Sequence, residues 1–397
     1  MRNPTSFLRE EYEELVEKSL DWRLKTLYGP SEPFSNVDGR EVIVLCSNNY
    51  LGLTTHPRLK EAALAAIETH GVGSGAVRPI SGTMDLHMEL EERLAKFKGA
   101  EAALTYPTGF MVNSGLIPQL VGRGDLIVSD ALNHGSIIDG VRLTRADRAI
   151  YKHNDMEDLA RVLDEAEKHD PEYRRILIIT DGVFSMDGDI APLDEVAKLG
   201  KEHGAMIYVD DAHGEGVLGK GGRGIVSHFG LDHEDVQVEM GTFSKAYGTI
   251  GGHISGSESL AKFAWNKSRT WLLSSSHPPP VVAATIAAID VLETEPQHVE
   301  NLWRNTRHFK KAVEDLGFNT GMSQTPIIPL IVGESSVAKK FSDVLYEEGI
   351  FVVPIVFPMV AQDLARIRVQ MNAKITVEQL DSVIETIEAT AKKLEII

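Results

Sequence analysis

Apolar residues recur at two spacings along the chain, and each spacing predicts a different element. Between about residues 100 and 256, short apolar runs rich in β-branched residues alternate with segments of helical period. Such alternation predicts a mostly parallel sheet covered on both faces by helices, an α/β architecture. We expect strands at 102–106, 126–129, 149–151, 176–180, 206–210 and 236–240, with helices at 155–168 and 192–203 among the connections.

The flanking regions have different patterns. Residues 5–28 predict an amphipathic helix that Gly29 and Pro30 end, and a strand over 42–45 and a helix from Pro57 follow. Residues 71–82 form a glycine-rich loop, either a plain linker or, with Arg78, a segment suited to approach a ligand. A helix over 86–97 follows this loop.

The C-terminal residues predict a smaller α+β domain. Helices are expected over 281–317, 336–348 and from Thr376, with strands over 327–332 and 367–371. The predicted organisation is an N-terminal helical segment with a short strand (1–55), a large α/β domain (56–285) and a small α+β domain (286–397).

The composition excludes several classes of protein. The chain has 397 residues, of which 43% are hydrophobic and 25% charged, as in an ordinary globular protein. Its formal charge of −18 disfavours nucleic acid and anionic membranes as partners. No apolar stretch reaches the roughly 18 residues of a membrane span, and the N-terminus lacks a signal peptide, so we expect a cytoplasmic protein. The single cysteine, Cys46, is expected to be a buried apolar residue.

A lysine follows the last of the predicted strands. Lys245 lies in the glycine- and hydroxyl-rich segment TFSKAYGTIGG, residues 242–252. A lysine at the end of a buried strand can lose water and hold a carbonyl group as a Schiff base. Most loop lysines are simply solvated, so this interpretation depends on partners elsewhere in the chain.

Acidic and imidazole groups follow the strand at 206–210. A buried Asp210 is either a structural hydrogen-bonding group or the counter-ion of a cation such as a pyridinium nitrogen, and His213 lies three residues on. Gly109 begins a predicted helix whose free N–H groups suit a phosphate, with Thr242 as a further donor.

Two further strand ends carry polar groups. His134 follows the strand at 126–129 and has the flat ring needed to stack on an aromatic cofactor, although an ordinary loop histidine fits equally well. Asp181 and Ser185 follow the strand at 176–180. Because ligands of parallel sheets bind outside the carboxyl ends of the strands, these groups together suit one phosphorylated aromatic aldehyde.

The combined motifs resemble the α-oxoamine synthase family of fold type I pyridoxal-phosphate enzymes, over nearly the whole chain. They are, in order, SNNYLGL at 47–53, SDALNH at 129–134, TDGVFSMDG at 180–188, VDDAH at 209–213 and GTFSK at 241–245. The resemblance implies pyridoxal 5'-phosphate as cofactor, no metal, and a homodimer with active sites at the interface.

The resemblance also implies roles for individual residues. Lys245 is the expected Schiff-base lysine, Asp210 contacts the pyridine nitrogen, His213 the phenolic oxygen, and His134 stacks on the ring. The phosphate contacts are Gly109, Phe110, Thr242 and, from the neighbouring subunit, Ser275. Ser185 lines the ring or substrate, Arg368 binds the amino-acid carboxylate, and Asn48 and Arg23 lie near the substrate.

The family joins an amino acid such as glycine or alanine to an acyl-CoA or acyl-carrier thioester through a Schiff base and a carbanion. The sequence at residues 77–78, 130–142 and 180–188 most resembles the 2-amino-3-ketobutyrate CoA ligase branch of threonine degradation, which yields glycine and acetyl-CoA. Residues 276–279 instead resemble the 8-amino-7-oxononanoate synthase branch of biotin synthesis, which joins alanine to a pimeloyl thioester. We therefore expect a relaxed enzyme with the ketobutyrate activity first and the second branch as the alternative.

Three other functions are alternatives. A non-catalytic partner subunit on the same fold is disfavoured because Lys245, Asp210 and His213 are all present. A pyridoxal-phosphate-binding regulator would need a DNA-binding module, and no basic patch or helix-turn-helix segment precedes the sheet. An aminotransferase of the same fold would release a keto acid without consuming a thioester.

Overall fold

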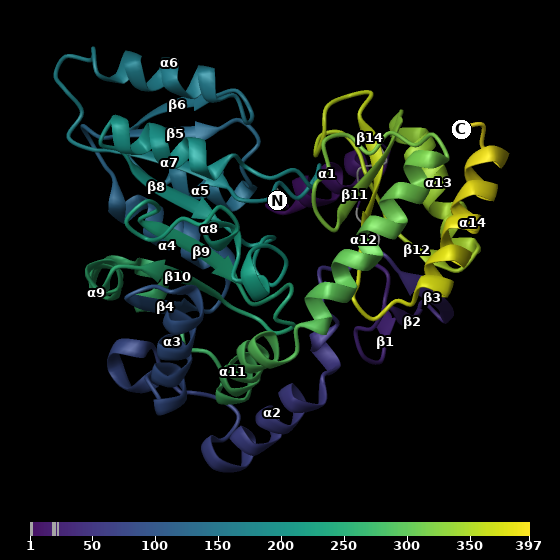
Figure 1. Cartoon of the computed structure of the whole chain (residues 1–397), viewed down its shortest axis with the longest axis horizontal. Helices are drawn as coiled ribbons and strands as arrows, with labels where there is room; N and C mark the ends of the chain where they lie inside the picture. Colours follow the sequence, from purple (N-terminus) through teal and green to yellow (C-terminus); the bar gives the residue numbers. More distant parts are fainter. Residues whose placement is uncertain (1–2, 18–20, 22–23) are drawn as a thin grey trace.

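The computed structural model describes residues 3–17, 21 and 24–397. Figure 1 shows a large region built around one sheet and a smaller region around β11 and β14; α12 lies in the smaller region and follows α11 of the large one. The proposed domain boundaries stay a prediction. In the described part of the chain, no helix is both long and apolar enough to cross a bilayer.

The large region has the predicted α/β sheet at its centre. Within residues 24–397 this sheet has seven strands in the order β4-β10-β9-β8-β7-β5-β6. The β5, β6, β7, β8 and β9 strands pair in parallel, whereas β10 is antiparallel to both of its neighbours. The strands are β4 (Ala102–Tyr106), β5 (Leu126–Asp130), β6 (Asp147–Tyr151), β7 (Ile176–Asp181), β8 (Met206–Asp210), β9 (Val238–Thr242) and β10 (Gly252–Gly256).

Helices cover both faces of this sheet because successive strand residues point to opposite sides. On β7, Leu177 and Ile179 pack in one apolar cluster with α4 and α5, while Ile178 packs in another with α6 and α7. The helices of this region are α2 (Pro57–His70), α3 (Asp85–Lys98), α4 (Gly109–Leu120), α5 (Gly135–Arg142), α6 (Met156–Ala166), α7 (Leu193–Glu202), α8 (Ile225–His228), α9 (Glu258–Lys267), α10 (Arg269–Leu273) and α11 (Pro279–Thr294).

The C-terminal residues form the predicted α+β arrangement. β11 and β13 flank β14 in an antiparallel sheet, and the helices α12, α13 and α14 surround it (Figure 1). Thr376 caps the last helix by accepting a hydrogen bond from the Gln379 N–H. The elements are α12 (Gln297–Asp315), β11 (Ile327–Gly333), α13 (Ser335–Glu347), β12 (Ile350–Phe351), β13 (Val353–Ile355), β14 (Ala365–Gln370) and α14 (Val377–Lys393).

The N-terminal prediction of one helix over residues 5–28 is wrong. Helix α1 covers Ser6–Glu17, and Leu27–Tyr28 is a strand, β1, that pairs with β2 (Phe34–Val37). The next strand, β3 (Arg40–Val44), pairs with β2 and, in parallel, with β12. The N-terminal strands therefore join the C-terminal region of the molecule through a contact that spans about 300 residues of sequence.

The loop at 71–82 places Arg78 in the interior instead of at an open surface. Its guanidinium donates to both carboxylate oxygens of Glu91 at 2.8 and 3.0 Å, and both side chains are buried. Glu91 also accepts hydrogen bonds from the backbone and hydroxyl of Thr105 on β4. Arg78 thus ties this loop to α3 and the edge of the sheet.

This buried ion pair leads to a prediction for stability. Arg78→Met leaves the Glu91 carboxylate buried without its cation, so we expect the free energy of unfolding to fall by about 3–5 kcal/mol. Urea denaturation measures the change. The matched control is Arg142→Met, which removes an exposed pair with Asp139 and is expected to cost less than about 1 kcal/mol. Equal effects of the two substitutions would contradict this role of Arg78.

Candidate active site

The register of the sheet brings the polar strand ends to one edge. Asp181 at the end of β7 lies opposite Asp210 at the end of β8, and Gly252 pairs with both Thr242 on β9 and Tyr106 on β4. The residues that follow β4, β5, β7, β8 and β9 therefore lie along one edge of the sheet, as the sequence predicted.

Lys245 lies three residues after the end of β9. Burial lowers the pKa of its amine to about 8, although the negative charge of Asp210 acts in the opposite direction. The positive charge of Arg368 also lowers this pKa. The lysine, the aspartate and the arginine are therefore close enough to act on one another, and the amine is readily available in its neutral, nucleophilic form.

Asp210 is buried and held by an asparagine. The Asn113 Nδ2 donates to Asp210 Oδ2 at 2.8 Å and lies 2.9 Å from the Ser136 hydroxyl, while the Tyr208 hydroxyl donates to Asn113 Oδ1 at 2.7 Å. The Ala212 N–H donates to the second oxygen of Asp210. Among the described residues, no cationic side chain forms an ion pair with Asp210. Its carboxylate is thus oriented and available to a cation at the site.

His134 occupies the N-cap position of α5. Its backbone N–H donates to Asp181 Oδ2 at 2.6 Å, and its Nδ1 accepts from the Ser136 N–H. Burial lowers the pKa of His134, and burial together with the charge of Asp210 raises the pKa of Asp181 well above its ordinary value. Asp181 therefore binds a proton more readily than an ordinary carboxyl group, and the His134 ring favours its uncharged form.

His213 is held by residues distant in the sequence. The Tyr50 hydroxyl lies 2.8 Å from His213 Nδ1 and accepts a hydrogen bond from Gln370 Nε2, which also donates to Asn48 Oδ1. A phenol hydroxyl can donate while it accepts, so the Tyr50 proton can point to Nδ1. Burial, with the positive charge of Lys245, lowers the pKa of His213 well below its ordinary value. A neutral His213 then carries its proton on Nε2, which is a donor.

The beginning of α4 lies against the end of β9. A Cβ atom added at Gly109 would lie 3.0 Å from Met240 Cε and 3.3 Å from Thr242 Oγ1, so a side chain there would crowd β9. Thr242 Oγ1 donates to the Gly251 carbonyl and lies 2.9 Å from the Ser244 hydroxyl. The free N–H groups at the beginning of α4 and the Ser244 hydroxyl thus lie at one corner of the sheet.

Arg368 reaches the site from the smaller region. It lies on β14, and its guanidinium donates to the Ser185 carbonyl at 3.0 Å, in the loop after β7. Its neighbour Arg366 is buried and paired with Asp187 in the same loop. The structure therefore brings Ser185 and Arg368 together, as a shared role at the site requires.

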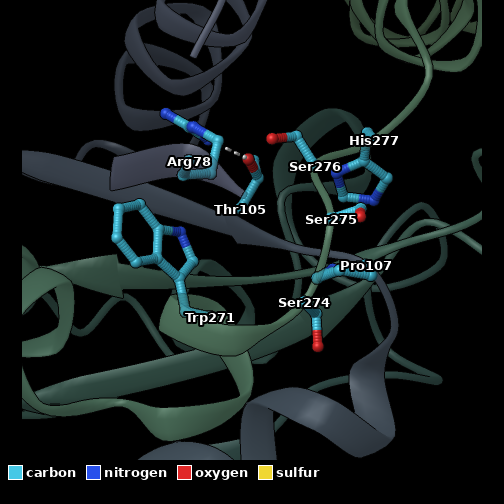
Figure 2. Close-up of a pocket in the computed structure, with 8 residues that line it drawn as sticks. All are labelled: Arg78, Thr105, Pro107, Trp271, Ser274, Ser275, Ser276 and His277. Atoms are coloured by element: carbon cyan, nitrogen blue, oxygen red, sulfur yellow. Dashed lines mark hydrogen bonds between the residues drawn. The ribbon is translucent and has the colours of Figure 1, made fainter. Parts of the chain in front are cut away.

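The remaining predicted residues are less tightly placed. Phe110 and Ser275 are exposed, and Arg23 lies outside the described residues. Figure 2 shows Ser275 with Ser274 and Ser276 on a loop beside Pro107, two residues before Gly109. These residues line one small pocket with Arg78, Thr105, Trp271 and His277. The supply of Ser275 by a neighbouring subunit stays a prediction.

Sequence reasoning missed Asn113, Tyr50 and Gln370. Asn113 is fully buried in the apolar helix GFMVNSGLIPQL, and a lone amide there is the signal that could have identified it. Tyr50 is part of the motif at 47–53, but its partner His213 is 163 residues away. No local pattern predicts such a contact.

These groups fit pyridoxal 5'-phosphate. The oriented Asp210 carboxylate suits a protonated ring nitrogen, the Nε2–H of His213 suits a phenolic oxygen, and the low pKa of Lys245 suits an aldehyde partner. The free N–H groups at the beginning of α4 suit a phosphate. None of these residues carries the same charge as the cofactor group that it would contact.

Comparisons with known proteins identify the family. Residues 40–387 match the family Aminotransferase class I and II. The 8-amino-7-oxononanoate synthase of Symbiobacterium thermophilum is 53% identical over 393 residues, covering 99% of each chain. The synthase of the same name from Thermoanaerobacter pseudethanolicus is 50% identical over 391 residues, covering 98% of each.

A solved structure extends the likeness to three dimensions. The serine palmitoyltransferase of S. paucimobilis, which holds bound PLP-myriocin, is 30% identical and has a TM-score of 0.92, covering 99% of this chain and 98% of its own. The sheet order, the strand-end residues and these matches agree. The chain therefore belongs to the class I and II aminotransferase family, and within it to the α-oxoamine synthases of PLP-dependent fold type I.

Proposed function

We propose that the chain condenses L-alanine with a pimeloyl thioester to give 8-amino-7-oxononanoate, CO2 and the free thiol. Its membership of the α-oxoamine synthases supports a PLP-dependent acyltransferase, and the names of relatives about 50% identical over nearly the full length support this pair of substrates. The set of Lys245, Asp210 and His213 at one sheet edge supports the PLP-dependent class of reaction, and the names of the relatives carry the choice of substrates.

The ketobutyrate branch, our first expectation from the sequence, is not supported by the relatives, which favour the alternative. The structure gives a physical reason. The segments that favoured the ketobutyrate branch make structural contacts. Arg78 pairs with the buried Glu91, and His134, at the end of the 130–134 turn, donates to Asp181 at the start of the 180–188 segment. These contacts serve any amino acid and any thioester, so they carry no information on the acyl group.

The cofactor of this reaction is pyridoxal 5'-phosphate, held by Lys245, Asp210, His213, His134 and the beginning of α4. When bound, it supplies an electron sink for negative charge that develops at the substrate Cα. The Asp210 carboxylate would stabilise a positive charge on the ring nitrogen of the cofactor. Asn113 and the Ala212 N–H fix the orientation of its two oxygens. His213 would donate from Nε2 in the tautomer whose Nδ1 accepts from the Tyr50 hydroxyl.

Lys245 and Arg368 act on the amino acid. With a pKa of about 8, the Lys245 amine accepts and returns a proton near neutral pH, which suits removal of the Cα proton. The fork of the Arg368 guanidinium matches a carboxylate, and its contact with the Ser185 carbonyl fixes its position. Binding the carboxylate at Arg368 would hold the amino acid near Lys245, since the two side chains are close enough for the charge of Arg368 to lower the pKa of Lys245.

The first prediction concerns the substrates. L-alanine with pimeloyl-CoA should release CoA thiol faster than glycine with acetyl-CoA, and Lys245→Ala should lower the rate by at least about a thousandfold because the amine acts in every turnover. A thiol-release assay with CO2 detection measures both pairs. Faster turnover of glycine and acetyl-CoA would restore the ketobutyrate reading, and keto-acid formation without thiol would indicate an aminotransferase.

The second prediction concerns the Lys245 proton. In protein freed of its cofactor, acetylation of Lys245 by acetic anhydride should increase as the pH rises through about 8, not through the ordinary lysine value of about 10.4. Peptide mass spectrometry measures the modified fraction. Asp210→Asn should move the midpoint lower still, since it removes a negative charge that raises this pKa. A midpoint near 10.4 would contradict the buried amine.

The third prediction concerns Arg368. Arg368→Met should raise KM for alanine by about 10–100-fold with a smaller change in kcat, because a charge-assisted hydrogen-bonding fork to the carboxylate is lost. Arg368→Lys keeps the positive charge but loses the two-pronged guanidinium. Its KM for alanine should therefore lie between the values of the wild type and Arg368→Met. Steady-state kinetics at saturating thioester give both constants. An unchanged KM would remove Arg368 from the carboxylate site.

A further inference from the structure

His153 lies between two turns that follow different strands of the sheet. It comes two residues after the end of β6, and its ring reaches the carboxylates of Asp130 and Asp189. The distances are 3.0 Å from Nδ1 to Asp130 Oδ1 and 2.7 Å from Nε2 to Asp189 Oδ2. Asp130 ends β5, and Asp189 lies in the turn after β7. One side chain thus bridges the turns that carry His134 and Ser185.

The bridge requires a charged ring. Both ring nitrogens face carboxylate oxygens, which only accept hydrogen bonds, so both nitrogens must carry protons. Burial lowers the pKa of His153, but the hydrogen bonds and charges of Asp130 and Asp189 outweigh it and raise the pKa to about 10. The edge of the ring also packs on Phe184, with centroids 4.3 Å apart. His153 is therefore an imidazolium clamp throughout the physiological range.

The next residue strengthens the clamp. The Asn154 N–H donates to Asp130 Oδ2 at 3.0 Å, and its side-chain amide donates to Asp189 Oδ2 at 2.9 Å. Asn154 has a φ of 51°, a conformation that asparagine adopts more readily than most residues. Both carboxylates are thus bound twice from one short segment, which fixes the spacing between them.

The Asp130 carboxylate organises the first turn, and the backbone of Asp189 closes the second. Asp130 Oδ1 accepts from the Leu132 N–H at 2.8 Å, within the turn that leads to His134. On the other side, the Phe184 N–H donates to the Asp189 carbonyl at 3.1 Å, which closes a compact turn over residues 184–189. Arg368 donates to the Ser185 carbonyl in that turn.

We propose that His153 is a positioning residue that fixes the separation of the 130–134 and 184–189 turns, and so sets the places of His134 and Arg368. It contacts neither substrate nor cofactor and acts only through Asp130 and Asp189. The kinetic consequence rests on the proposed function, in which Arg368 binds the amino-acid carboxylate. The structural consequence, two turns held by one cation, is independent of that function.

Hydrogen exchange read by mass spectrometry tests the structural part on the full-length protein. His153→Phe keeps an aromatic ring against Phe184 but removes both donors, so amides in both turns should exchange at least about tenfold faster. The matched control is His203→Phe. His203 also faces two carboxylates, Glu167 at 2.7 Å and Asp164 at 3.9 Å, but lies just after α7 and contacts α6 instead of the site. Its loss should leave both turns unchanged.

Asp189→Asn provides a second variant in case His153→Phe folds poorly. Without the Asp189 carboxylate, His153 loses one of its two charged partners and is held less firmly against Asp130. Amide hydrogen exchange should therefore become faster in residues 130–134 as well as in residues 184–189. Faster exchange confined to 184–189, or unchanged exchange in His153→Phe, overturns the clamp.

Kinetics with alanine and pimeloyl-CoA test the consequence for the site. His153→Phe should raise KM for alanine about tenfold, with less change in kcat, through a displaced Arg368. A general loss of folded protein would lower the apparent kcat and leave KM unchanged, which would overturn the positioning role. Wild-type protein that is inactive with this pair but shows the predicted exchange pattern would refute the proposed function and retain the clamp.

Discussion

A carboxylate buried at the end of a strand is stable only when other groups bind it, and this constraint organises the site. Asp210 has a nearly inaccessible side chain, yet Asn113 and the Ala212 N–H bind its two oxygens. Because Asn113 is also bound by Tyr208, the carboxylate has one defined orientation. The low pKa of Lys245 and the neutral state of His213 arise in the same buried environment.

A second layer of buried charge lies behind this edge. Lys98 Nζ lies 2.8 Å from Glu215 and 2.6 Å from Glu239, and Glu215 also contacts His253 at 2.9 Å. The cation comes from α3 and the acids from β9 and the loop after β8. Lys98 thus joins α3 to β9 and to the loop after β8. Its positive charge compensates the negative charge of these two buried acids.

The sequence predicted the parts of the fold that depend on local periodicity. The strands β4 to β9 and the helices α2, α3 and α11 to α14 follow from apolar patterns, and the strand-end residues follow from them. β10 was missed because its sequence, GHISG, is short and glycine-rich, and its burial depends on pairing with β4 and β9. The expected N-terminal helix failed at β1, where pairing with β2 overrides a loose helical period.

The site was predictable in its local groups and not in its long-range contacts. Lys245, Asp210 and His134 follow strands, so their positions could be inferred from the chain itself. The Tyr50, Gln370 and His213 network joins three distant segments, and no spacing rule predicts it. The choice between family branches was beyond the motifs for a related reason, since the segments that carry them contact one another and the strand-end residues.

The central claim is that Lys245 is the residue that holds pyridoxal 5'-phosphate at the carboxyl edge of the sheet. The most direct measurement is borohydride reduction of the cofactor-loaded protein, followed by proteolysis and peptide mass spectrometry. The account predicts that the cofactor mass is attached to Lys245, in the peptide that contains residues 242–252. Attachment to a different lysine, or no attachment in protein that has bound the cofactor, would contradict it.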